Sequence, residues 1–318
     1  MIGTGSGSRT MNKDFLSVLD LEPPELVRLL DVAAQLKAER RLGPRAPTSR
    51  ALAGSHVALL FEKPSLRTRS TFEIAVRELG GEILNVPAES VDGVREPLED
   101  IARNLERWVH GLVVRTFAQD RVVALAACTS TLHVINALTD QQHPCQALAD
   151  FMTLREHWGG WQGRTLAYVG DGNNVAASLS HAAAMLGVSV RIASPEGYEL
   201  PDRTVLEATR VACDGAAVVR VRDPREAVAG AHAVYTDAWT SMGQEHEAAH
   251  RRRAFEPYQV SGRLMAAAAP GALFMHCLPA HRGEEVTAEV LESTASVVFD
   301  QAENRLHTQK ALLLMLLG

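Results

Sequence analysis

The stretch HVALLFEKPSLRTR, residues 56–69, decides the fold because a strand pattern passes directly into a helix pattern within it. The apolar run over residues 56–61 predicts a short buried strand. Apolar side chains then recur at helical spacing over residues 72–79 and stop at Gly80-Gly81, a typical C-terminal end of a helix. Strand, loop and helix in this order are the unit of an α/β protein with a parallel sheet.

The same alternation continues along the chain in both directions. An amphipathic helix is expected from Asp20, and a second one begins near Pro97. Further strands are expected in the first half at residues 111–117 and 132–137. Short apolar runs in the second half predict six more strands, at residues 166–169, 188–193, 216–221, 233–236, 272–277 and 296–299. The pattern predicts an α/β fold with two doubly wound parallel-sheet domains.

The length of 318 residues suits two domains of ordinary size. We expect residues 1–10 to be a disordered leader or cloning remnant, and residues 11–142 and 159–300 to form the two domains. A helical pattern over residues 143–158 would join them. The last segment, residues 301–318, is expected to be a buried apolar helix that returns to pack on the first domain.

Charge and composition exclude several classes of protein. The chain has 32 basic and 38 acidic residues, and its longest basic run is Arg251-Arg252-Arg253. Clustered cations supply most of the affinity for a nucleic-acid backbone, so nucleic acid is not expected as a partner. With 46% hydrophobic and 22% charged residues, the composition is that of an ordinary globular protein.

The four cysteines form no C-x-x-C pair and are widely spaced, which indicates neither a zinc ribbon nor a disulfide framework. They favour a reducing compartment, and we expect a cytoplasmic location. The longest apolar stretches, residues 266–269 and 312–317, are far shorter than the ~20 residues that span a bilayer. No membrane association is expected.

The loop between the first strand and its helix could bind a phosphate group. Ser65 can cap the helix, whose first N–H groups lack partners, and Arg67 and Arg69 add cationic donors. From this segment alone, a capped helix with arginines facing solvent is an equally good interpretation.

Three other segments place polar groups at the carboxyl edge of a sheet, where ligands of α/β proteins bind. They are Arg115 at the end of a strand, His143 to Gln146 at the start of a helix, and His276-Cys277 after a strand. Taken singly, His143 is better explained as a helix cap and Cys277 as a small buried side chain. Taken together, they favour one binding site.

With these residues in view, the chain resembles the aspartate/ornithine carbamoyltransferase superfamily, and within it the ornithine carbamoyltransferases. The S-T-R-T-R signature appears as residues 65–69 and the H-P-x-Q-x-L-x-D element as residues 143–150. The D-x-x-x-S-M-G loop appears at residues 237–243, and H-C-L-P at residues 276–279 points to ornithine enzymes. The likeness runs from about residue 11 to residue 318 and includes Q-A-E-N-R at residues 301–305.

The resemblance implies a site for two substrates, carbamoyl phosphate and L-ornithine. The implied carbamoyl-phosphate ligands are Ser65, Leu66, Arg67, Thr68, Arg115, His143, Gln146, Cys277, Leu278 and Arg305. The implied ornithine ligands are Asn174, Asp237, Ser241 and Met242, and the catalytic residues are Arg115, His143, Asp237 and Cys277. It implies no metal or organic cofactor, and a homotrimer or a multiple of trimers.

Two positions depart from the family pattern. Leu66 replaces the usual threonine, which is tolerable if that position contributes mainly its backbone N–H. Residues 88–96 contain no glutamine, although the family usually places there a glutamine that reaches the site of a neighbouring subunit. We therefore assign no intersubunit ligand.

The implied reaction transfers the carbamoyl group to the δ-amine of ornithine, giving citrulline and phosphate. An amine with a pKa of about 10.4 needs roughly 4.6 kcal/mol to lose its proton at pH 7, and only the neutral amine can attack. Cys277 and Asp237 are the expected groups to favour that form. The residues leave open whether the enzyme serves arginine biosynthesis or breakdown.

Three alternatives remain at this point. A second carbamoyltransferase type would use putrescine or N-acetylornithine as the amine. A NAD-dependent dehydrogenase is suggested only by Gly170, Gly172 and Val175, which give G-x-G-x-x-V without the third glycine. A catalytically silent binding subunit is disfavoured by the intact polar and cationic residues.

Overall fold

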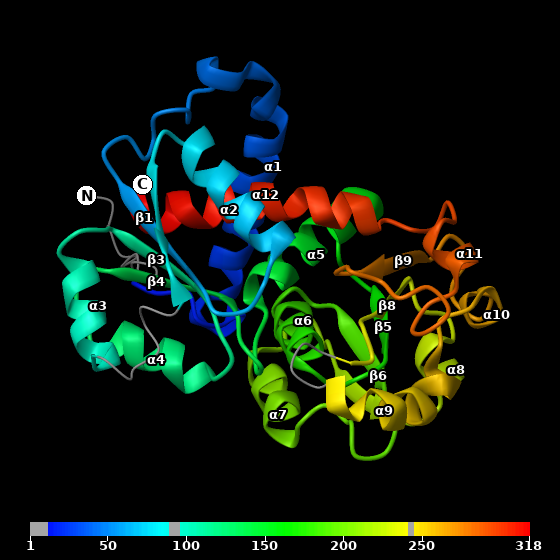
Figure 1. The fold of residues 1–318 in the computed structure, drawn as a ribbon. Helices are drawn as coiled ribbons and strands as arrows, with labels where there is room; N and C mark the ends of the chain where they lie inside the picture. The colour runs from blue at the N-terminus through cyan, green and yellow to red at the C-terminus, as the bar shows by residue number, and fades with distance from the viewer. Residues whose placement is uncertain (1–11, 89–95, 241–244) are drawn as a thin grey trace, which may run out of the picture.

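The computed structural model describes residues 12–88, 96–240 and 245–318. Its first half contains a four-stranded parallel sheet in the order β2-β1-β3-β4 (Figure 1). The strands are β1 (His56–Phe61), β2 (Glu82–Val86), β3 (Gly111–Arg115) and β4 (His133–Leu138). Strand β2 lies on one side of β1, whereas β3 and then β4 lie on its other side. The strand order therefore reverses between β1 and β3.

The second half contains a five-stranded parallel sheet in the order β7-β6-β5-β8-β9. The strands are β5 (Thr165–Val169), β6 (Ser189–Ala193), β7 (Val218–Val221), β8 (Ala233–Thr236) and β9 (Leu273–His276). Here the order reverses between β5 and β8. Loops that leave such a reversal point diverge and leave room for a ligand at the carboxyl ends of the strands.

Helices surround both sheets (Figure 1). The longer ones are α1 (Pro23–Glu39), α2 (Leu66–Glu78), α3 (Leu98–Glu106), α4 (Gln119–Ala127), α5 (Pro144–Trp158), α6 (Asn174–Met185), α7 (Asp202–Val211), α9 (Ala248–Phe255) and α12 (Val298–Leu317). The shorter ones are α8 (Pro224–Val228), α10 (Gly262–Met265), α11 (Ala288–Leu291), η1 (Val18–Asp20), η2 (Arg40–Arg45), η4 (Glu245–Glu247) and η5 (Glu256–Tyr258).

The predicted α/β class with two parallel sheets is confirmed, and eight of the strands expected from the sequence are present within a few residues of their expected bounds. The strand expected at residues 296–299 is wrong. Ser296 forms only an isolated bridge with Phe274, and Val298 already begins α12. The run of apolar residues there reflects a helix start in which Val298 is buried while Phe299 is 70% exposed.

Around the first sheet, strand β2 and helix α4 were not anticipated. Strand β2 lies at the edge of its sheet and most of its residues are exposed or half-buried, so its sequence carries no alternating or continuous apolar pattern. It is held in place by its parallel ladder with β1.

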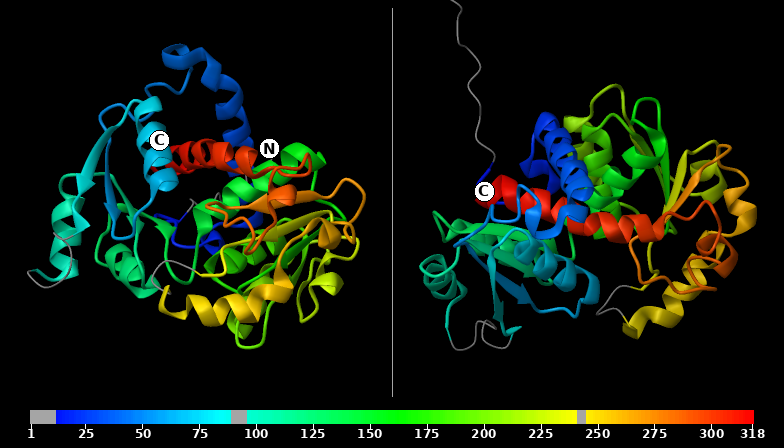
Figure 2. Two further views of the ribbon diagram at one scale, coloured as in Figure 1. Left: turned by 45° about the vertical axis from the view of Figure 1, so that its right-hand side comes forward. Right: turned by 90° about the horizontal axis from the view of Figure 1, so that it is seen from above.

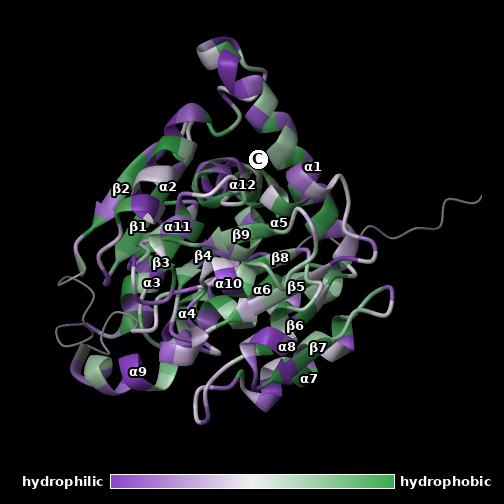
Figure 3. Ribbon diagram, turned by 90° about the vertical axis from the view of Figure 1, so that its right-hand side faces the viewer, coloured by the Kyte–Doolittle hydropathy of each residue, from purple (hydrophilic) through white to green (hydrophobic). Residues whose placement is uncertain are grey.

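Helix α12 is buried along most of its length and packs against α5, α1 and α2. Figure 2 shows it crossing from the second sheet to the first, with the C-terminus beside the first sheet. Its side chains, such as Leu312, join one hydrophobic core with residues of both halves, including Phe72 on α2 and Tyr168 on β5. Figure 3 shows the hydrophobic residues gathered on the interior strands and hydrophilic residues on outer helices such as α9. The domain boundaries expected at residues 142/143 and 158/159 stay predictions.

Among the helices of the described residues, none has both the length and the apolar character needed to cross a bilayer.

Candidate active site

The loop after β1 carries the predicted phosphate-binding segment into the N-terminus of α2. Ser65 caps this helix as expected, because its side chain accepts a hydrogen bond from the backbone N–H of Thr68 at 3.2 Å. The side chain of Leu66 is 79% exposed. This position can therefore offer a ligand its backbone N–H at the positive end of the helix dipole, and a threonine hydroxyl is not needed for that contact.

Arg305 brings three of the predicted residues together from three helices. Its guanidinium, on α12, donates to Thr68 Oγ1 on α2 at 2.7 Å and to Gln146 Oε1 on α5 at 2.5 Å. The side chain is buried, and its Nε has no hydrogen-bond partner within the described residues. No sequence motif links these positions, since Thr68 and Arg305 are 237 residues apart.

Arg115 and His143 extend this cationic region. Arg115 is the last residue of β3 and pairs in register with Phe61, so it lies beside the start of the phosphate loop. Burial, followed by the positive charge of Arg305, lowers the pKa of Arg115 to about 10, and Arg67 acts in the same direction. A buried cation without a carboxylate partner costs free energy, which an incoming anion would relieve.

His143 precedes α5 and its ring is almost completely buried. Burial lowers the pKa of His143 well below its usual value, and the charges of Arg305 and Arg115 lower it further. The imidazole is therefore neutral at pH 7 and can donate one N–H to a ligand. Its Nδ1 has no partner within the described residues, and its backbone N–H is fixed by Ser178 Oγ at 2.9 Å.

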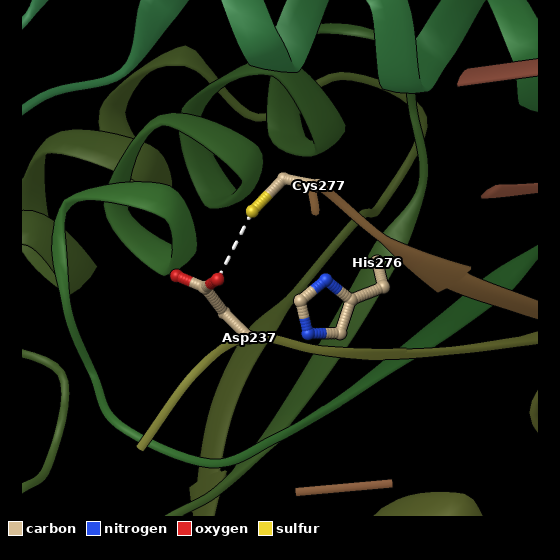
Figure 4. A group of neighbouring side chains, drawn as sticks. All are labelled: Asp237, His276 and Cys277. Atoms are coloured by element: carbon tan, nitrogen blue, oxygen red, sulfur yellow. Dashed lines mark hydrogen bonds between the residues drawn. The ribbon is translucent and has the colours of Figure 1, made fainter. Parts of the chain in front are cut away.

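The acidic part of the site comes from the second sheet. Asp237 follows β8 and Cys277 follows β9, and the pairing of Thr236 with His276 places the two residues side by side. The Cys277 thiol donates to Asp237 Oδ1 at 3.0 Å, as Figure 4 shows. Burial and the charge of Asp237 raise the pKa of Cys277 well above its usual value. The sulfur is a neutral thiol at physiological pH.

Asn173 is a site residue that sequence reasoning missed. Its Oδ1 caps α6 by accepting from the N–H of Val175 at 3.0 Å, and its Nδ2 donates to Asp237 Oδ2 at 2.9 Å. Both oxygens of Asp237 are thus engaged, one by Asn173 and the other by Cys277. An asparagine directly before an apolar helical run is a helix-cap signal, and that signal could have singled it out.

The side chain of the predicted ligand Asn174 is engaged by the protein itself. Its side-chain amide donates to the backbone oxygen of Thr139, at the end of the first sheet. Its contact with ornithine stays a prediction. Ser241 and Met242 lie outside the described residues, and so do residues 89–95 of the stretch 88–96, in which the family's usual glutamine was sought.

Asp237, His276 and Cys277 are also chemically able to hold a metal ion, since their ligand atoms lie within 4.8 Å of one another (Figure 4). Both ring nitrogens of His276 are already engaged, Nδ1 by the N–H of Leu278 at 2.8 Å and Nε2 by Glu285 Oε1 at 3.3 Å. A metal ion would have to displace one of these contacts and the thiol proton. A second group of this kind is formed by His281, Glu284 and Glu285.

Leu278 and the phosphate loop lie in separate parts of the chain, yet the residues around them form one region. Helix α12 joins the two parts: Arg305 contacts Thr68 and Gln146, and Gln301, one turn earlier, accepts from the backbone N–H of His276, the residue before Cys277. Loops at the reversal points of both sheets therefore contribute to a single site, cationic on the first sheet and acidic on the second.

Comparisons with known proteins agree with this arrangement. Residues 13–156 match the family model described as the carbamoyl-P binding domain of aspartate/ornithine carbamoyltransferase. Residues 162–316 match the corresponding Asp/Orn binding domain.

Similar proteins cover almost the whole chain. An ornithine carbamoyltransferase of Acidothermus cellulolyticus is 52% identical over 96% of this chain and 97% of its own length. The crystal structure of the Thermus thermophilus ornithine carbamoyltransferase matches with a TM-score of 0.87 at 46% identity, covering 97% of this chain and 100% of that one. That from Pyrococcus furiosus matches with a TM-score of 0.91 at 45% identity, covering 96% and 97%. The chain therefore belongs to the aspartate/ornithine carbamoyltransferase family.

Proposed function

We propose that this protein is an ornithine carbamoyltransferase, which transfers the carbamoyl group of carbamoyl phosphate to the δ-amine of L-ornithine and releases citrulline and phosphate. The observation that carries this proposal is the meeting of two opposite environments. Buried Arg115 and Arg305, each with an Nε that has no partner within the described residues, lie near the Asp237–Cys277 pair, which suits an amine. The relatives named above are ornithine carbamoyltransferases, and they match this chain over nearly their full length.

Carbamoyl phosphate would bind on the cationic side. The N-terminus of α2 and the guanidinium of Arg305 would hold the phosphate, while Arg115 and the neutral His143 would donate to the carbonyl oxygen. Negative charge grows on that oxygen when the amine attacks, so these donors bind more strongly in the transition state than in the ground state. The same cations stabilise the phosphate as it leaves.

Ornithine would bind on the acidic side. The neutral δ-amine attacks the carbamoyl carbon, a tetrahedral intermediate forms, and the C–O bond to phosphate breaks. The amine proton then leaves to phosphate or solvent. Cys277 is protonated at physiological pH, so it acts as a hydrogen-bonding group here and not as a covalent nucleophile. Asp237 exchanges its contacts with Asn173 or Cys277 for a contact with a substrate ammonium.

The geometry counts against the dehydrogenase alternative. A Cβ at Gly172 would lie 2.2 Å from the backbone nitrogen of Leu200, and the Gly172 N–H donates to the oxygen of Tyr198 at 2.8 Å. A dinucleotide would have to approach the backbone of this turn closely, but the protein's own backbone fills that space. Asp171, in the same turn, forms an ion pair with Arg251.

The decisive experiment is a panel of amine acceptors assayed with carbamoyl phosphate: ornithine, putrescine, N-acetylornithine and aspartate. We expect ornithine to give citrulline with a kcat/KM at least about 10² above the others, because a site that pairs a substrate's charged groups leaves them unpaired with an analogue that lacks them. A faster reaction with putrescine or N-acetylornithine would replace ornithine as the acceptor. No carbamoyl product with any amine would overturn the proposal.

We also propose that the protein works as a trimer, or a multiple of trimers, in the cytoplasm. The four cysteines are all unpaired, which fits a reducing compartment. Light scattering of the purified protein measures the assembly directly, and a monomer at assay concentration would contradict it.

A further inference from the structure

Asp150 occupies the middle of helix α5, between the two halves of the site, and its side chain is completely buried. Its Oδ1 accepts two hydrogen bonds, from Gln146 Nε2 at 2.8 Å and from Gln301 Nε2 at 2.9 Å. Gln146 lies one turn earlier on the same helix, whereas Gln301 comes from α12. One carboxylate oxygen therefore joins two glutamines of different helices.

This oxygen decides which way each glutamine amide faces. An ionised carboxylate only accepts hydrogen bonds, so both amides must turn their NH2 group toward it and their oxygen away. The oxygen of Gln146 then accepts from the Arg305 guanidinium, and the oxygen of Gln301 accepts from the backbone N–H of His276 at 3.0 Å. Reversing either amide would set two donors, or two acceptors, against each other.

The result is a continuous buried chain of hydrogen bonds from one half of the site to the other. Its members, in order, are Thr68, Arg305, Gln146, Asp150, Gln301 and the N–H of His276. One end is Thr68, whose backbone N–H donates to the Ser65 cap of the phosphate loop, and the other is the residue before Cys277. We propose that Asp150 is a positioning residue that orients both glutamines and thereby couples the placement of Arg305 to that of Cys277; this inference rests on the proposed function.

The charges around Asp150 are compatible with this role. Arg305 on α12 and Tyr235 on β8 face it, and Cys277 at the end of β9 is near enough to be affected by its charge. Burial raises the pKa of Asp150 to about 6, against the lowering effects of Gln146, Gln301, Tyr235 and Arg305. The group is thus a carboxylate at pH 7–8. Below about pH 6 it takes up a proton and becomes a donor itself, which competes with one glutamine.

The simpler reading is that Asp150 only fastens α12 to α5. The chain offers a matched control for it one turn further along the same contact, where Asn304 Nδ2 donates to Thr153 Oγ1 at 2.9 Å. Thr153 is equally buried, and Asn304 continues to Glu156 and Lys37, away from the site. If Asp150 only stabilises the packing of α12 on α5, substitutions of Asp150 and Thr153 should have similar effects on phosphate binding and on the reactivity of Cys277.

The test compares Asp150→Ala, Asp150→Asn, Gln301→Met and Thr153→Val in the full-length protein. The readouts are kcat and KM for both substrates, the Kd for inorganic phosphate, and the rate at which iodoacetamide alkylates Cys277, followed by peptide mass spectrometry. Thermal melting reports the structural contribution separately.

We expect Asp150→Ala to weaken phosphate binding at least about fivefold and to change Cys277 alkylation at least about threefold, because both ends of the chain lose their orientation. Gln301→Met should change Cys277 alkylation and leave phosphate binding within twofold, and Thr153→Val should change neither. Asp150→Asn retains an acceptor oxygen, so it should keep at least a third of the wild-type kcat at pH 8. Because it cannot ionise, the inflection near pH 6 in the pH profile of kcat should disappear.

An Asp150→Ala protein that melts lower but binds phosphate and reacts at Cys277 like Thr153→Val would overturn the inference. If Asp150→Ala does not fold, two other measurements test the inference. They are the difference in Cys277 alkylation between Gln301→Met and Thr153→Val, and the pH profile of kcat for Asp150→Asn. The phosphate and thiol readouts need no turnover, so failure of the coupling is distinguishable from failure of the proposed function.

Discussion

The two halves of the candidate site solve opposite problems. In the first half, the side chains of Arg115 and Arg305 are buried cations. Within the described residues, the Nε atoms of these two arginines and the Nδ1 of His143 have no hydrogen-bond partner. Around Asp237, the carboxylate is fully engaged by Asn173 and Cys277. The first half offers an anion donors that have no protein partner within the described residues, while the second must give up internal hydrogen bonds to accept its substrate. We therefore expect substitutions in the first half to act mainly on the transition state, and substitutions in the second half to act on recognition of the amine.

The largest expected effect is that of Arg115→Gln. Loss of one buried donor to a developing oxyanion typically lowers kcat about 10²–10³-fold, or about 3–4 kcal/mol. The check is the rate of citrulline formation at saturating substrates, with Arg103→Gln on the exposed face of α3 as the control. A kcat within threefold of the wild type would show that Arg115 contributes little to the transition state. The proposed difference between the two halves of the site would then be wrong.

A somewhat smaller effect is expected from Asp237→Asn. This change removes the negative charge that Asn173 and Cys277 contact, and unpairing a buried charged contact costs about 2–5 kcal/mol. We expect kcat/KM for ornithine to fall about 10²-fold while the Kd for inorganic phosphate stays within twofold of the wild type. Asp202→Asn, at an exposed position, is the matched control. Equal losses for both ligands would show that the two halves are not chemically separate.

The smallest expected effect concerns the thiol of Cys277. Since burial and then the charge of Asp237 raise its pKa, little thiolate is present at pH 8, and alkylation by iodoacetamide should keep accelerating above pH 9. Asp237→Asn removes the second cause and lowers the pKa, and one unit corresponds to about tenfold faster alkylation at pH 8. Peptide mass spectrometry distinguishes Cys277 from the partly exposed Cys213. An unchanged rate would show that burial alone keeps the sulfur protonated.

Sequence patterns predicted the local features of this molecule well. The strand at His56–Phe61 and the cap at Ser65 follow from apolar runs and from side-chain chemistry within a few residues. Patterns failed where an element depends on distant neighbours. Strand β2 is held by its ladder with β1, and residues 296–299 resemble a strand although they lead into a helix.

The candidate site shows the same division. Arg115, His143 and Cys277 could be selected because each ends a strand, follows one or caps a helix at the carboxyl edge of a sheet. Asn173 was missed because its partner, Asp237, is 64 residues away. A side chain that acts as a helix cap and also orients a carboxylate shows only the first role in its local sequence.

The order of residues along the chain was enough to establish the α/β class, the phosphate-loop cap and the family motifs, since these depend on periodicity and on residue chemistry over short spans. Which side chains meet depended on the folded chain. The register of β8 with β9 sets Asp237 beside Cys277, and the path of α12 sets Arg305 against Thr68 and Gln301 against Asp150. Contacts between residues that are far apart in the sequence arise only when sheets and helices pack, because no local pattern carries information about such separations.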